Sequence, residues 1–92
     1  MRKVLKNEEY YVIIDDESTC ANVLVYNIQD ERLTFQYSNK GDFYSYYDIS
    51  KNDFMNLAKS ESIGKHITTE VKCHRFSKTP IALPDAIDAI AA

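Results

Sequence analysis

Apolar and polar residues alternate along the first half of the chain, a pattern typical of strands that bury one face. The clearest alternation covers residues 32–37, where Leu33, Phe35 and Tyr37 share one side. The predicted strands are residues 10–14, 21–28, 32–37 and 42–48. Since short polar turns join them, we expect a small antiparallel sheet of three to four strands.

Apolar residues take up helical spacing after residue 50. Ser50 and Asp53 form the S-x-x-D pattern of a capping box. Phe54 and Leu57 follow on one side of the predicted helix, residues 51–59. These two side chains are therefore expected to pack against the sheet.

A second amphipathic helix is predicted from residue 63 to about residue 74, because Ile63, Ile67 and Val71 recur every four residues. Pro84 begins a short apolar segment, and proline is tolerated in the first turn of a helix. The sequence thus predicts an α+β fold in which two helices pack on one face of the sheet and a short helix lies near the C-terminus.

The length of 92 residues and the hydrophobic content of 45% suit one compact core, so residues 1–92 are expected to form a single domain. A core of this size is marginally stable. Association buries further apolar surface, and the apolar segment near the C-terminus offers such surface. We therefore expect a homo-oligomer.

No apolar run approaches the roughly 18 residues that a membrane span needs, and the basic start lacks the apolar stretch of a signal peptide. The expectation is a cytoplasmic protein with no membrane partner. Cys20 and Cys73 lack the C-x-x-C pattern and are expected to be reduced. His66, Cys73 and His74 fit no common zinc spacing, so neither a metal nor another cofactor is expected.

Charge is unevenly distributed along a chain whose net charge is −3. Residues 59–78 carry five basic side chains against two acidic ones. The basic residues of this segment are Lys59, Lys65, Lys72, Arg75 and Lys78. An anionic ligand is expected to be attracted to this segment.

The first candidate site lies at the start of the second predicted helix, in the run Ser62-Ile63-Gly64-Lys65-His66. Unpaired backbone N–H groups and the helix dipole favour an anion there, and phosphate is the natural guest. Gly64 would let the ligand approach the backbone, and Lys65 would add a positive charge. The structural alternative is that Ser62 only caps the helix and Gly64 only lets it pack on the sheet.

Tyr44 and Tyr46 share one face of a predicted strand and could stack a nucleobase, with Lys72 as a further candidate near the site. Core or interface packing is the alternative for both tyrosines.

His66-Ile67-Thr68 has the H-x-T form used by two-histidine phosphoesterases, in which each histidine handles a proton. That chemistry needs two such motifs, and His74-Arg75-Phe76-Ser77 is out of register. No P-loop, catalytic triad order or paired-carboxylate motif is present, so no enzymatic activity is expected.

The stretch from Gly41 to Lys65 resembles the KTSC domain, a small module named after a lysyl-tRNA synthetase C-terminal segment and frequent in bacteriophage proteins. The shared pattern is Gly41-x-Phe43-Tyr44-x-Tyr46-x-x-Ile49-Ser50-x-x-x-Phe54-x-x-Leu57-x-x-Ser60-x-Ser62-x-Gly64-Lys65. Ser50, Ser60, His66, Ile67 and Thr68 depart from the usual family residues.

The resemblance implies an α+β module, suspected of binding nucleic acid, with no established enzymatic activity. It places the family core at about residues 20–76, with an N-terminal strand extension at 1–19 and a C-terminal tail at 77–92.

These observations favour a non-catalytic, phage-type binding protein that captures an anionic, nucleotide-like small molecule. Sequestration of a host defence signal is one use that such capture would serve. The alternatives are an RNA- or DNA-binding KTSC module and a phosphodiesterase acting on a nucleotide signal. The acidic net charge favours the small ligand, because binding a long polyanion relies on neutralising many phosphates.

Overall fold

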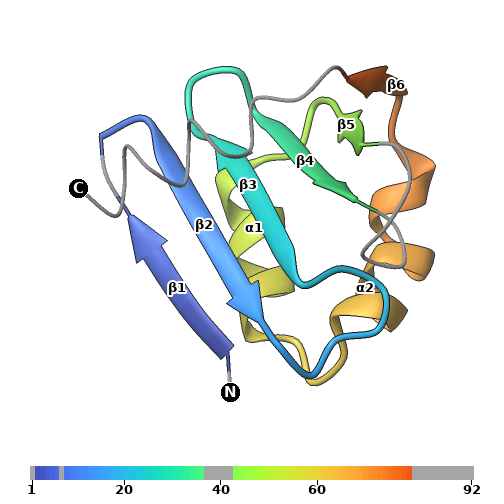
Figure 1. The fold of residues 1–92 in the computed structure, drawn as a ribbon. Helices are drawn as coiled ribbons and strands as arrows, with labels where there is room; N and C mark the ends of the chain where they lie inside the picture. The colour runs from blue at the N-terminus through green and yellow to red at the C-terminus, as the bar shows by residue number, and fades with distance from the viewer. Residues whose placement is uncertain (1, 7, 37–42, 80–92) are drawn as a thin grey trace.

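The fold is built on one antiparallel sheet whose six strands lie in the order in which they follow along the chain (Figure 1). The structure is a computed structural model and describes residues 2–6, 8–36 and 43–79. The strands are β1 (Arg2–Lys6), β2 (Tyr10–Asp15), β3 (Val23–Asn27), β4 (Arg32–Gln36), β5 (Phe43–Tyr46) and β6 (Phe76–Thr79). The predicted α+β class is confirmed, but the predicted three to four strands are too few.

The two strands that the prediction missed, β1 and β6, form the edges of the sheet. Each pairs with one neighbour, β1 with β2 and β6 with β5. An edge strand needs little apolar surface, and both segments are rich in polar or charged residues. The alternation that marks central strands is therefore weak in them. The predicted C-terminal helix lies outside the described residues.

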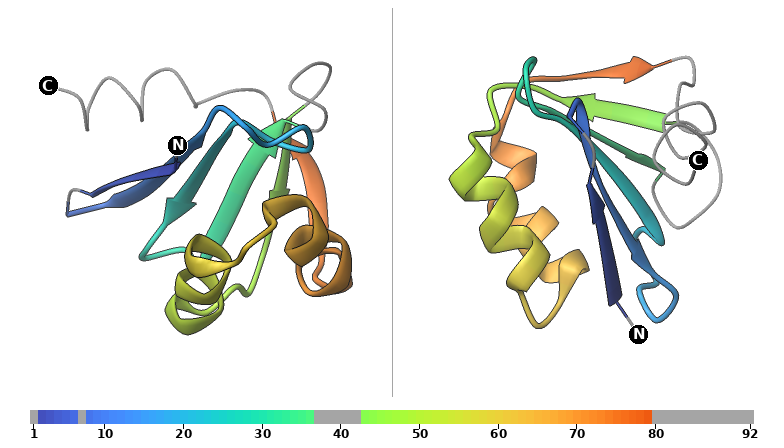
Figure 2. Two further views of the ribbon diagram at one scale, coloured as in Figure 1. Left: turned by 90° about the horizontal axis from the view of Figure 1, so that it is seen from below. Right: turned by 90° about the vertical axis from the view of Figure 1, so that its left-hand side faces the viewer.

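Three helical segments connect β5 to β6 and cover one face of the sheet (Figure 2). They are α1 (Lys51–Lys59), α2 (Ile63–Thr69) and the 3₁₀ turn η2 (Val71–Cys73). Ser50 caps α1 as predicted, since its Oγ accepts a hydrogen bond from the backbone N–H of Asp53 at 3.1 Å. In the described part of the chain, no helix is long and apolar enough to cross a membrane.

The second helix ends earlier than predicted. Thr68 and Thr69 donate their hydroxyl hydrogens to the carbonyls of Gly64 and Lys65, both at 2.9 Å. Such bonds from β-branched residues to the preceding turn weaken and bend a helix. The chain accordingly leaves the α-helix at Glu70 and continues as η2, with Val71 still buried.

The main core lies between the sheet and the helices. Its aromatic centre is Phe54 of α1, which stacks on Tyr26 with 4.5 Å between ring centroids. The Tyr26 hydroxyl donates a hydrogen bond to the carbonyl of Ile49 at 2.6 Å, so its polar end is satisfied although the residue is buried. The other large buried residues of this core are Tyr11, Ile13, Leu24, Leu33, Phe35, Tyr46, Leu57, Ile63, Ile67 and Val71.

Strand β2 belongs to the same core as the rest of the chain, and a polar residue of β1 bonds to the end of α1. Tyr11 and Ile13 of β2 are buried beneath the helices. Arg2 of β1 donates a hydrogen bond from Nε to Asp15 at 3.0 Å, and its Nη1 reaches the carbonyls of Ala58 and Ser60 at the end of α1. Arg2 thus ties an edge strand to a helix that lies far along the sequence.

Candidate ligand-binding site

The seven residues predicted to bind ligand lie in three different places. Tyr44, Tyr46 and Lys72 line one groove beside β6. Ser62 and Gly64 lie at the start of α2, and Lys65 is exposed on the first turn of that helix. His66 lines a third cavity, between α1 and the α2–η2 segment. The structure therefore separates residues that the sequence prediction had treated as a single site.

At the start of α2, Ser62 and Gly64 have structural roles. Ser62 Oγ accepts a hydrogen bond from the backbone N–H of Lys65 at 3.2 Å, which is a helix cap. Gly64 packs against Cys20, because a Cβ added at position 64 would lie 3.1 Å from the Cys20 Cβ. These contacts account for both residues without a ligand.

The surroundings of the α2 start are acidic. The adjoining cavity, of about 260 Å³, is lined by Asp15, Glu17 and Glu61, and by Arg2 as the one basic residue among the described lining residues. Arg2 is already hydrogen-bonded to Asp15 at 3.0 Å. Burial would raise the pKa of Asp15, but hydrogen bonds from Arg2 and from the Glu17 backbone outweigh burial and hold that pKa below its ordinary value. The carboxylate is charged at neutral pH, so this cavity is poorly suited to an anion.

The groove beside β6, which we call the aromatic groove, is lined by Tyr44, Tyr46, Lys72 and Phe76 and has a volume of about 470 Å³. The Phe76 ring lies 6.0 Å from the Tyr44 ring and 5.4 Å from the Tyr46 ring, measured between centroids. Tyr46 also stacks on Phe35 at 5.5 Å, with only 6° between the ring planes. The groove thus has an aromatic floor continuous with the core.

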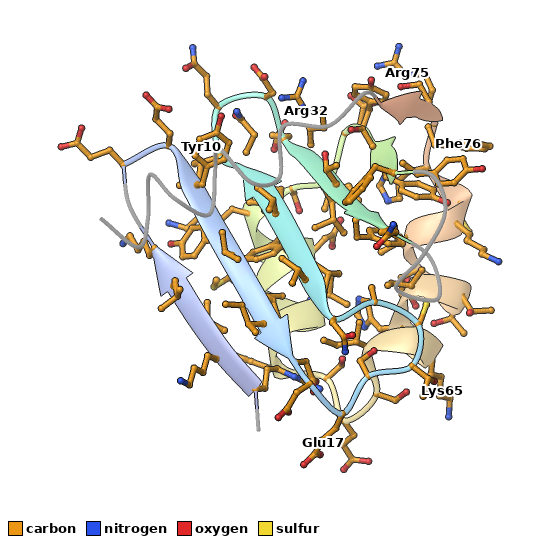
Figure 3. The ribbon with its side chains drawn as sticks, in the orientation of Figure 1. Tyr10, Glu17, Arg32, Lys65, Arg75 and Phe76 are labelled. Carbon is orange, nitrogen blue, oxygen red and sulfur yellow. The ribbon has the colours of Figure 1, made fainter. Side chains whose placement is uncertain are left out.

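The aromatic side chains of the groove differ in burial. Tyr46 is 4% exposed and forms the floor, whereas Tyr44 is half-buried. Phe76 is 56% exposed, and Figure 3 shows it at the β6 side of the molecule, well apart from Lys65. A phenylalanine exposed to this extent offers one apolar ring face that a planar ligand can cover.

Lys72 supplies the one charge among the described residues that line the groove. Its ammonium also acts on Cys20, where burial raises the pKa of the thiol and Lys72 opposes that rise. The raised pKa keeps the Cys20 thiol neutral at pH 7. The groove therefore combines aromatic rings with a positive charge.

The prediction missed Phe76. Its closeness to Tyr46 comes from strand pairing, in which Tyr46 of β5 faces Phe76 of β6. The only local signal was an aromatic residue within the basic segment 59–78.

The third cavity, of about 260 Å³, brings His66 and His74 together with Asp53, Asn56 and Glu70 over a floor of Ile49, Leu57 and Val71. The described residues include no set of three His, Cys, Asp or Glu side chains placed to hold a metal. His66 and Thr68 lie two apart on α2, so they point to different sides of the helix. The H-x-T motif cannot direct both side chains at one phosphate oxygen.

These features define a class of small α+β domain. Two capped helices pack on an antiparallel sheet, and an aromatic groove lies at the sheet edge. The chain belongs to the KTSC domain family, whose sequence model matches residues 17–76. The match covers β3, β4, β5 and the three helical segments, and β1 and β2 precede it. No curated protein matches the chain significantly.

Proposed function

We propose that this KTSC domain is a non-catalytic binding protein for an anionic, nucleotide-like ligand, and that the ligand lies in the aromatic groove. The observation that supports the proposal is the convergence of Tyr44, Tyr46 and Lys72 with the exposed ring of Phe76. These residues come from β5, η2 and β6.

The chemistry of the groove matches the two parts of a nucleotide. A base can stack on the exposed Phe76 ring, with the tilted Tyr44 ring at its edge, and stacking on an aromatic side chain is worth roughly 1–3 kcal/mol per base. The Lys72 ammonium can bind a phosphate, and a charge-assisted hydrogen bond contributes about 1.5–3 kcal/mol. A mononucleotide held by these contacts is expected to bind in roughly the micromolar to millimolar range.

Capture without turnover is the mode of action in this proposal. In a bacteriophage, such a protein would sequester a host nucleotide signal that serves defence. Self-association remains a prediction, and a second copy is not required to form the groove.

Binding of single-stranded RNA or DNA is the second candidate. Phe76 lies exposed on an edge strand of the sheet, and this position favours the second candidate. A nucleic-acid chain longer than the groove could continue past that edge. Arg75 precedes Phe76 and is exposed, so it could meet a second phosphate. The net charge of −3 weighs against this candidate, because a polyanion is repelled by the rest of the surface.

Calorimetric titration with AMP, GMP, CMP, UMP, a cyclic dinucleotide and an oligothymidine distinguishes these functions. The proposal predicts saturable binding of at least one small nucleotide and no turnover of the cyclic dinucleotide. Tight binding of the oligothymidine alone, falling steeply between about 50 and 200 mM salt, would support nucleic-acid binding instead.

The variant that tests the groove is Phe76→Ala, which removes the exposed ring. It is expected to weaken nucleotide binding about five- to a hundredfold, the equivalent of one stacking contact. Val4→Ala is the matched control, since Val4 is 45% exposed on the other edge strand. Equal binding by Phe76→Ala and the parent protein would exclude the groove.

A further inference from the structure

Tyr47, the residue that follows β5, is a point of contact for the whole segment between η2 and β6. Its backbone N–H donates a hydrogen bond to the Arg75 carbonyl at 2.9 Å, and its hydroxyl shares one with Ser77 Oγ at 2.7 Å. The Arg75 guanidinium lies over the Tyr47 ring, 4.9 Å from its centroid. The Tyr47 carbonyl completes the set by pairing with His74 Nδ1 at 3.0 Å.

The bond between His74 and Tyr47 has a defined direction. A carbonyl oxygen can only accept a hydrogen bond, so Nδ1 of His74 carries the hydrogen. The neutral ring in this tautomer has an N–H at Nδ1, and so does the protonated ring. The bond is therefore compatible with both charge states of the imidazole.

His74 lies between the two residues that complete the aromatic groove. Lys72 precedes it on η2, and Phe76 follows it at the start of β6. β6 has four residues and one neighbouring strand, and its first side chain is more than half exposed. Burial therefore contributes little to holding Phe76. Pairing with β5 places Phe76 opposite Tyr46, and the bonds to Tyr47 set the path by which the chain enters β6.

We propose that His74 is a positioning residue for the aromatic groove. Its Nδ1–H bond to the Tyr47 carbonyl fixes how the chain turns from η2 into β6, and so sets Lys72 and Phe76 against Tyr44 and Tyr46. The consequence for ligand affinity rests on the function proposed above. The consequence for the ring geometry does not.

The chemistry of amide side chains provides a matched pair of variants. Asparagine can place an N–H donor where His74 has Nδ1, whereas the longer glutamine places its donor near the Nε2 position. His74→Asn is expected to keep the bond to Tyr47, and His74→Gln to lose it. His66→Gln is the control, because His66 and His74 line the same cavity between α1 and the α2–η2 segment, and His66 does so from α2.

The experiment combines NMR of the free protein with calorimetric titration of AMP. In His74→Gln, the ring contacts of Phe76 with Tyr44 and Tyr46 should be lost or strongly weakened, and AMP should bind about three- to tenfold more weakly, the effect of one neutral hydrogen bond. His74→Asn should retain the contacts and bind AMP within about twofold of the parent protein, and His66→Gln should match the parent in both.

Several results would overturn the proposal. One is unchanged ring contacts in His74→Gln, and another is equal loss in the Asn and Gln variants. Global unfolding of His74→Gln would mean that the bond stabilises the whole fold and does not position the groove alone. If the parent protein binds none of the nucleotides, the proposed function fails, and the ring contacts still decide the role of His74.

Discussion

The aromatic groove and the start of α2 both carry residues that the sequence marks as ligand-binding, but the structure uses them differently. At the start of α2, the Ser62 hydroxyl caps the helix and the bare backbone of Gly64 accommodates Cys20. In the groove, Phe76 is 56% exposed beside Tyr44. The first set of residues completes the fold, and the second presents a surface.

The electrostatic surroundings sharpen the difference. Carboxylates of Asp15, Glu17 and Glu61 line the cavity beside α2. Among the described residues that line the groove, the single charge is the Lys72 ammonium. A basic segment in the sequence therefore does not have to act as one anion site, because the fold directs its side chains to different neighbours.

The largest expected effect is on the free energy of unfolding, when the loss of a buried aromatic side chain is compared with the loss of the exposed Phe76 ring. Phe54 stacks on Tyr26 at 4.5 Å and contacts the tilted ring of Tyr11 at 5.4 Å, so Phe54→Ala should lower the free energy of unfolding by about 3–5 kcal/mol. Phe76→Ala should lower it by less than about 1 kcal/mol, since the side chain is largely exposed. Denaturant unfolding measures both. Similar losses would mean that the groove is part of the core.

The next effect concerns Arg2, the basic residue beside the α2 start. Arg2→Ala removes charge-assisted hydrogen bonds to Asp15 and to the end of α1, and it should cost about 1.5–3 kcal/mol at pH 7. AMP binding should be unchanged, because Arg2 is already hydrogen-bonded to Asp15. Loss of AMP affinity in a folded Arg2→Ala variant would move the anion site to the α2 cavity.

The same ion pair predicts a pH dependence of stability. The pKa of Asp15 is lower in the folded protein than its ordinary value of 3.8, so the unfolded chain takes up its proton first as the pH falls. The contribution of Asp15 is therefore fully present above the ordinary pKa and is lost as the pH falls from there through the lower pKa of the folded protein. Asp15→Asn should flatten the acid side of the stability profile, and an unchanged slope would show that the pair contributes little.

A smaller effect is expected at Gly64. Gly64→Val places a branched side chain against Cys20, and overpacking of this kind costs about 1–3 kcal/mol. Thermal unfolding should register the loss, with Gly64→Ala less affected, while AMP affinity stays the same. If Gly64→Val keeps its stability and loses AMP binding, the glycine faces a ligand.

The local features of the fold were predictable because their causes are local. Alternation identified the central strands, and Ser50 and Ser62 marked the helix starts through their capping bonds. The edge strands β1 and β6 were missed, because they are short and polar and their position depends on pairing with distant residues.

The site was less predictable than the fold. A serine followed by a glycine at a helix start gives the same local signal whether it caps and packs or binds an anion. The contact that distinguishes the two is Gly64 against Cys20, which lies on a distant loop. Tyr44, Tyr46 and Lys72, which the sequence offers as candidates, line one groove, and Phe76 reaches that groove through the pairing of β5 with β6, which the sequence does not reveal.

The most direct test compares two exposed lysines, Lys72 of the groove and Lys65 of α2, by calorimetric titration of AMP. Lys72→Ala should weaken binding about tenfold, equivalent to about 1.4 kcal/mol, because the phosphate loses its cationic partner. Lys65→Ala should bind AMP as the parent protein does. The reverse outcome, full affinity in Lys72→Ala and loss in Lys65→Ala, would place the ligand at the start of α2 and contradict the assignment of the groove.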